Sequence, residues 1–133
     1  MLNISIVGLG LMGKQHLEAI NIHPNCRVAS IVDNNVKAAE LLTSSGHPFF
    51  SNLEEAIRQT KPDGLIIATP NARHFEDGLL GLKLGIPILV EKPISDSLLD
   101  AKKLIQYGQK INVPILTGYH RRHNPIIFDI KKK

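Results

Sequence analysis

The chain has 133 residues, of which 43% are hydrophobic and 21% charged, with a formal net charge of +4. These values are typical of one globular domain, and no run approaches the ~20 apolar residues of a membrane-spanning helix. The basic residues are spread along the sequence and there is no tryptophan, so we expect neither a nucleic-acid partner nor a membrane partner.

The N-terminal part contains a dinucleotide-binding pattern. A strand predicted over residues 3–7 runs into the sequence Gly-Leu-Gly-Leu-Met-Gly at residues 8–13, and a helix is predicted over 12–22. In this pattern the first glycine permits a tight turn, the second lets the backbone approach a pyrophosphate, and the third lets the helix pack closely. Free N–H groups at the helix start then face the phosphates.

An acidic residue completes the pattern. A second strand, predicted over residues 27–33, ends on Asp33, twenty residues after the last glycine. A carboxylate that accepts hydrogen bonds from the adenosine ribose contributes roughly 1.5–3 kcal/mol. Beside a 2′-phosphate at about 4 Å it would be repelled by roughly 4 kcal/mol. NAD is therefore predicted over NADP, while a structural turn and an S-adenosylmethionine methyltransferase remain alternatives.

The rest of the chain alternates between the two kinds of element. Further strands are predicted near residues 48–50, 64–69, 87–91 and 113–118, and further helices near 35–44, 52–59, 72–84 and 97–109. This alternation predicts an α/β fold, a doubly wound parallel sheet in the order 3-2-1-4-5-6 with helices on both faces. The residues expected to cap helix N-termini are Ser51, Asn71, and Ser95 or Asp96.

Cysteine and histidine usage predicts no metal site. The single cysteine, Cys26, has no disulfide or C-x-x-C partner and is expected to pack at the start of the second strand. Five histidines lack the i, i+4 pairing with acids that a zinc site would show: His16, His23, His47, His120 and His123. Because the chain enters a strand directly, without a signal segment, we expect a cytoplasmic location.

Polar residues follow the later strands. Ligands of doubly wound sheets collect outside the carboxyl ends of the strands, so these residues are candidates for a site. The fourth strand is followed by Thr69-Pro70-Asn71 with His74, and the fifth by Glu91-Lys92-Pro93. Other interpretations remain open, because Asn71 could only cap a helix, His74 could lie on the surface, and Glu91-Lys92-Pro93 could be a solvated strand end.

Together with the glycine loop of residues 8–13, Asp33 and the 118–125 stretch, the motifs after the fourth and fifth strands resemble the Gfo/Idh/MocA oxidoreductases, the family of glucose-fructose oxidoreductase and inositol dehydrogenase. The resemblance covers the whole chain and implies a Rossmann domain that binds NAD, or less readily NADP. It implies that Asn71 and His74 lie near the nicotinamide. The residues that we expect at the cofactor are Gly8, Gly10, Leu11, Met12, Gly13, Asp33, Asn34, Thr69, Pro70, Asn71, His74, Glu91 and Lys92.

The resemblance also implies a chemistry. The lysine at position 92 would reach the oxygen of a sugar or polyol substrate, which makes Lys92 the candidate for proton exchange during hydride transfer. Period-two alternation places Glu91 on the opposite side of the strand end, where we expect it to anchor backbone or a partner charge. Family members carry a second domain with the remaining catalytic residues, usually an aspartate and a histidine.

The chain end bears on how complete the site is. We predict a dinucleotide-binding domain over residues 1–120 and, over 121–133, the start of a helix leading towards a missing substrate domain. An isolated helix this short is marginal, so we favour a longer protein over a basic cap. We expect an NAD-dependent sugar or polyol oxidoreductase that is catalytically incomplete alone, with a stand-alone NAD-binding module as the alternative and the oligomeric state open.

Overall fold

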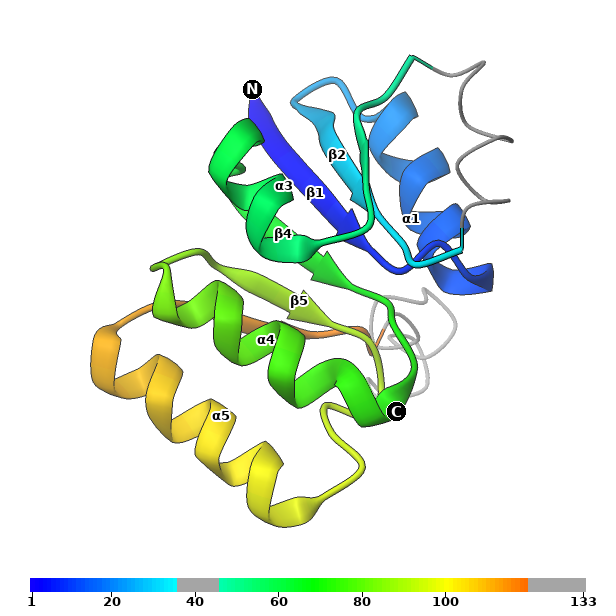
Figure 1. The fold of residues 1–133 in the computed structure, drawn as a ribbon. Helices are drawn as coiled ribbons and strands as arrows, with labels where there is room; N and C mark the ends of the chain where they lie inside the picture. Colours follow the sequence, from blue (N-terminus) through cyan, green and yellow to red (C-terminus); the bar gives the residue numbers. More distant parts are fainter. Residues whose placement is uncertain (36–45, 120–133) are drawn as a thin grey trace, which may run out of the picture.

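The structure, a computed structural model, describes residues 1–35 and 46–119 (Figure 1). Six strands form one sheet in the order β3-β2-β1-β4-β5-β6, and each neighbouring pair is parallel. The strands are β1 (Leu2–Val7), β2 (Cys26–Val32), β3 (Phe49–Phe50), β4 (Gly64–Ile67), β5 (Ile88–Val90) and β6 (Ile115–Thr117). The predicted fold class and strand order are confirmed.

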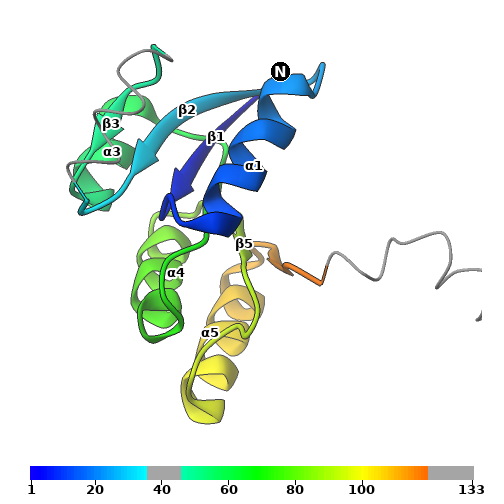
Figure 2. The ribbon, with the colours of Figure 1, turned by 90° about the vertical axis from the view of Figure 1, so that its right-hand side faces the viewer.

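Helices cover both faces of this sheet. They are α1 (Leu11–Ile22), α3 (Leu53–Thr60), α4 (His74–Lys83) and α5 (Leu98–Ile111), with a short 3-10 turn, η2 (Asn71–Arg73), before α4. Figure 2 shows α1 on one side of β1 and β2 and α3 on the other. The helix predicted over 72–84 therefore starts as a 3-10 turn, and α4 itself begins at His74.

Period-two alternation along the strands divides the core between the two faces. Ile6 and Ile31 are fully buried on the side of α1, where they belong to a cluster with Leu17 and Ile20. Their neighbours, exemplified by Val7, belong to the larger cluster on the opposite face. Cys26, half-buried at the start of β2, packs against the first cluster as expected. The carboxyl ends of all six parallel strands thus meet at one edge.

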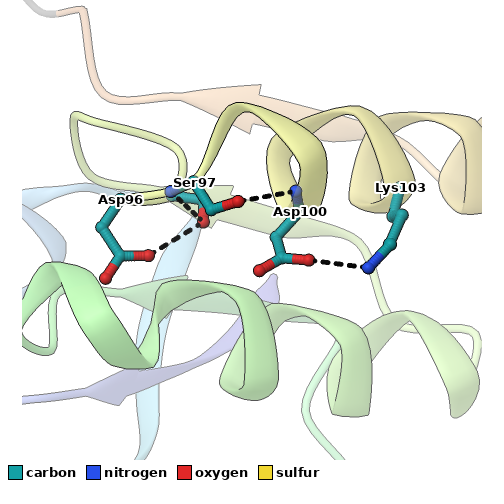
Figure 3. Close-up of polar contacts among 5 residues, drawn as sticks. Asp96, Ser97, Asp100 and Lys103 are labelled. Atoms are coloured by element: carbon teal, nitrogen blue, oxygen red, sulfur yellow. Dashed lines mark hydrogen bonds and ion pairs between the residues drawn. The ribbon is translucent and has the colours of Figure 1, made fainter.

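The predicted cap of α5 is wrong by one or two positions. The hydroxyl oxygen of Ser97 accepts a hydrogen bond from the Asp100 N–H at 3.3 Å, while the Ser95 hydroxyl accepts from the Ser97 N–H at 3.2 Å (Figure 3). Lys103 pairs with Asp100 one turn further along. The helix register is set by burial of Ala101 and Leu104, and this places Ser97, not Ser95 or Asp96, at the N-cap.

The other two predicted caps are also wrong. Asn52, rather than Ser51, caps α3, because its side-chain oxygen accepts from the Glu55 N–H at 2.9 Å. Asn71 caps nothing with its side chain, since the chain first makes a 3-10 turn in which the Arg73 N–H donates to the Pro70 carbonyl. Adjacent polar residues compete for these positions, and the packing of the helix decides between them.

Ser97→Ala is expected to lower the free energy of unfolding by about 1 kcal/mol, because an orphan N–H at the start of α5 loses its acceptor. Urea denaturation measures this change. Asp96→Ala is the matched control and should alter stability by only a few tenths, about 0.3 kcal/mol, through the helix dipole. Equal losses in the two variants would contradict the assignment of Ser97 as the cap.

Several expectations lie outside the described residues. These are the helix predicted over 35–44, apart from Asn35, the stretch from residue 120 onward, and the helical start over 121–133. Within residues 1–35 and 46–119, no helix is long and apolar enough to cross a bilayer.

Candidate functional site

A cavity of about 660 Å³ opens beyond the carboxyl ends of β1, β2 and β4. Gly8 and Gly10 line it after β1, and Asp33, Asn34 and Asn35 line it after β2. On its remaining sides lie Ser51, Leu53, Ala68, Thr69, Pro70 and Arg73. The strand order reverses between β1 and β4, so the cavity occupies the position where doubly wound sheets bind ligands.

The glycine loop is held at the sheet edge by backbone hydrogen bonds. The Gly8 N–H donates to the Val32 carbonyl and the Ala68 N–H to the Val7 carbonyl, both at 2.7 Å. Gly8 has φ +93°, and a Cβ there would come within 2.6 Å of the Ala68 oxygen. Residues that carry a side chain rarely adopt such a backbone conformation, so the turn that leads from β1 into the cavity depends on glycine.

The other two glycines differ in what surrounds them. A Cβ on Gly13 would collide with the carbonyl oxygen of Gly8, so the first turn of α1 can lie against the end of β1 only without a side chain. A Cβ on Gly10 would meet no atom within 4 Å, and Gly10 borders the cavity. The packing of the fold therefore does not require glycine at position 10, whereas the open space of the cavity beside it does depend on the absence of a side chain.

Asp33 is oriented by the backbone around it. One carboxylate oxygen accepts the Leu9 N–H at 2.6 Å and the other accepts the Asn35 N–H at 2.8 Å. A carboxylate has about four acceptor positions, so two remain for a ligand hydroxyl. The sequence pattern predicted an acid at this place but not its hydrogen bond to the glycine loop.

Thr69, Asp77 and Arg73 form a polar cluster beside the cavity. The Thr69 hydroxyl donates to Asp77 at 2.9 Å, and the Arg73 guanidinium donates to the same carboxylate from Nη2 at 2.8 Å and from Nε at 3.3 Å. The hydrogen bond to Asp77, followed by the charge of that carboxylate, raises the pKa of Arg73. Arg73 and Asp77 were not among the predicted site residues, although their i, i+4 spacing in a predicted helix is a recognisable signal.

His74 joins two loops. Its side chain is buried, with Nδ1 2.7 Å from the Pro93 carbonyl oxygen and Nε2 2.7 Å from the Thr69 carbonyl oxygen. The alternative of a surface histidine is therefore wrong. The ring does not border the 660 Å³ cavity, and its contact with a cofactor stays a prediction. What the structure shows is a buried link between the loops that follow β4 and β5.

Glu91 and Lys92, directly after β5, differ in burial, and their placement on opposite sides of the strand end stays a prediction. Glu91 is buried; one of its oxygens is 2.8 Å from His16 Nε2, and the other accepts the Lys92 N–H at 3.3 Å. Gly118 leaves room for this carboxylate, since a Cβ there would lie 2.7 Å from its nearer oxygen. Glu91 therefore anchors a neighbouring side chain and backbone, while the Lys92 side chain is exposed.

The thirteen predicted cofactor residues divide into two groups. Those that border the cavity are Gly8, Gly10, Asp33, Asn34, Thr69 and Pro70. Those that do not are Leu11, Met12, Gly13, Asn71, His74, Glu91 and Lys92. Met12 and Glu91 instead border a separate hollow of about 420 Å³. Among residues 1–35 and 46–119, no three His, Cys, Asp or Glu side chains come together as a metal site would require.

Comparison with known families and sequences gives a consistent match. Residues 2–119 match the model of the Gfo/Idh/MocA oxidoreductase family, described as having an NAD-binding Rossmann fold. The chain is 29% identical to an inositol 2-dehydrogenase of Corynebacterium glutamicum over 98% of its own length, and 30% identical to a glucose-6-phosphate 3-dehydrogenase of Bacillus subtilis over 92%. It spans only 40% and 35% of these two proteins.

Solved structures show the same architecture. The WlbA dehydrogenase from Bordetella pertussis, in complex with NADH and UDP-GlcNAcA, superposes with a TM-score of 0.92 at 26% identity. This alignment covers 98% of the chain and 41% of WlbA. GenD2 from gentamicin A biosynthesis, in complex with NAD, matches with a TM-score of 0.82 at 28% identity, over 88% of the chain and 34% of GenD2. More than half of each relative thus has no counterpart in these 133 residues.

Proposed function

Since the chain belongs to the Gfo/Idh/MocA oxidoreductase family, we propose that it is the cofactor-binding part of an NAD-dependent dehydrogenase acting on a sugar or polyol. One observation carries this proposal. The cavity at the strand-order reversal is bordered by Gly10, whose backbone carries no side chain, and by Asp33, whose carboxylate is oriented by the Leu9 N–H. The family match also favours an oxidoreductase over the alternative of an S-adenosylmethionine methyltransferase.

These two features of the cavity suit two chemical parts of NAD, the pyrophosphate and the adenosine ribose. At Gly10 no side chain keeps a pyrophosphate from the N-terminus of α1, whose unpaired N–H groups and helix dipole attract anions. The acceptor positions left on Asp33 suit ribose hydroxyls. A 2′-phosphate at about 4 Å from the same carboxylate would be repelled by roughly 4 kcal/mol. NAD, rather than NADP, is therefore the proposed cofactor.

The substrate side rests on the relatives. Inositol and glucose 6-phosphate are named as substrates of two of them, and WlbA was solved with a sugar nucleotide. A polyol or sugar hydroxyl that loses hydride to NAD must also lose a proton. Lys92, exposed beside the anchored Glu91, is the proposed acceptor of that proton. The length that the relatives have beyond this chain would supply the remainder of the substrate pocket.

We also propose a cytoplasmic location. The single cysteine cannot form an internal disulfide, which is usual for proteins of a reducing compartment where nicotinamide cofactors are used.

Binding of NAD by this chain alone tests the proposal. NAD at a hundred times its dissociation constant is expected to stabilise the fold by about 2.7 kcal/mol, seen as a rise in melting temperature. Asp33→Ala should weaken NAD and narrow its advantage over NADP, because the ribose loses its acceptor and the 2′-phosphate loses a repulsive charge. Calorimetric titration measures both affinities.

Two controls belong to this experiment. Asp33→Asn keeps one oxygen for the Leu9 N–H and separates an effect on the loop from an effect of charge. Asp96→Ala removes an exposed carboxylate that does not border the cavity and should leave both affinities unchanged. The proposal fails if millimolar NAD, NADH, NADP and NADPH all leave the melting temperature of the unchanged chain where it was.

A further inference from the structure

We infer that Arg73 binds the adenine base of the dinucleotide by stacking its guanidinium plane on the ring. Arg73 thereby determines affinity through the base and not through the phosphates. The inference rests on the proposed function and adds a residue to the site that the motifs do not contain. It follows from how the guanidinium is held, from its charge environment and from what else borders the cavity.

The edge of the guanidinium is already engaged. Nη2 and Nε both donate to the Asp77 carboxylate, and that carboxylate is buried and also held by the Thr69 hydroxyl. Such a two-point contact fixes the plane of the group. The Arg73 side chain is nevertheless 48% exposed. With the Nε and Nη2 edge bound to Asp77 and the side chain half in solvent, the flat faces and the Nη1 side of the group are left to meet a ligand.

The charge of Arg73 is balanced locally. Asp77 lies four residues away on α4 and forms a close ion pair with the guanidinium. An arginine paired in this way attracts a phosphate less than an unpaired arginine does, because the neighbouring carboxylate repels the anion. Stacking of a guanidinium on an aromatic ring depends on the plane of the group as well as on its charge, and it persists when one edge is bound.

The position of Arg73 matches that of the base. If Asp33 holds the adenosine ribose, the attached base extends into the same cavity, which Ser51, Leu53 and Arg73 also border. Among the described residues that border this cavity, none has an aromatic ring. The guanidinium of Arg73 is therefore the delocalised cationic plane that this part of the protein offers to a purine.

The test compares four forms of the 133-residue chain by calorimetric titration with NAD and with AMP: unchanged, Arg73→Ala, Arg73→Lys and Arg58→Ala. Arg73→Ala is expected to bind both ligands about fivefold more weakly. Arg73→Lys should bind nearly as weakly, because an ammonium group keeps the charge without the plane. The loss should be similar at low and at high salt. Arg58→Ala removes an exposed arginine of α3 outside the cavity and should bind like the unchanged chain.

The outcomes are distinguishable. Unchanged NAD affinity in Arg73→Ala overturns this inference and leaves the proposed function standing. So does full retention of affinity in Arg73→Lys together with a loss in Arg73→Ala that vanishes at high salt, because that pattern indicates pairing with phosphate. Failure of the unchanged chain to bind NAD overturns both. Melting curves without ligand establish that each variant is folded, and Arg73→Lys alone decides if Arg73→Ala does not fold.

Discussion

Gly13→Ala is expected to lower the free energy of unfolding by about 3 kcal/mol or more. A Cβ at this position would collide with the Gly8 carbonyl oxygen and lie 2.9 Å from the carbon of the same group. Both atoms belong to the backbone, so no side-chain rotation relieves the clash and α1 must move away from the end of β1. Denaturation in urea, followed by circular dichroism, measures the loss.

Gly10→Ala is the matched control, and it is expected to lower NAD affinity while leaving stability almost unchanged. No atom lies within 4 Å of a Cβ at Gly10, which has φ −67°, so stability should change by about 0.5 kcal/mol or less. The added methyl group would stand where we place the pyrophosphate, and NAD affinity should fall about tenfold or more. The assignment of the two glycines is wrong if Gly13→Ala is as stable as the parent or Gly10→Ala binds NAD normally.

Lys92→Ala is expected to lower dehydrogenase turnover about a hundredfold or more in a protein that has a complete substrate pocket. Such a protein is a chimera in which this chain replaces the matching part of an inositol 2-dehydrogenase. NAD affinity should stay nearly intact, because Lys92 does not border the cavity. Steady-state rates with myo-inositol and calorimetric titration with NAD separate the two effects.

Two controls accompany Lys92→Ala: removal of another lysine, and the 133-residue chain without the rest of the substrate pocket. Lys83→Ala removes another exposed lysine, in the last turn of α4, and should retain turnover. The 133-residue chain alone should show little or none, because a misplacement of reactants by about 1 Å already costs about a hundredfold in rate. Turnover by the short chain near ~10 per second would show that it holds a complete site. A stand-alone NAD-binding module would also bind NAD without turnover. Turnover by the chimera therefore distinguishes the cofactor-binding part of a dehydrogenase from such a module.

The features that could be predicted from the sequence are those that local patterns encode. Strand and helix alternation, the three glycines and the acid after β2 each depend on spacing within a short segment. Even the difference in burial between Glu91 and Lys92 agrees with the period of a strand.

The features that could not be predicted depend on contacts between distant segments. His16 meets Glu91 across 75 positions of the sequence, and His74 meets the Pro93 carbonyl across 19. Nothing in the local pattern indicates either pair, because each requires the finished sheet. The cap residues failed for another reason. Ser51 and Asn52 are equally suited by type, and only the packing of Leu53 and Ala56 in the core selects the second.

The hydrogen bond between the Leu9 N–H and the Asp33 carboxylate has a consequence for the thermodynamics of binding. Because the protein's own backbone fixes the loop and the acid in one arrangement, a ligand at this site need not order them, and the entropy of that ordering does not oppose association. The heat capacity change on binding should then carry no contribution from folding of the Leu9 loop, beyond the apolar surface that the ligand covers. In this respect the cavity is a preorganised receptor.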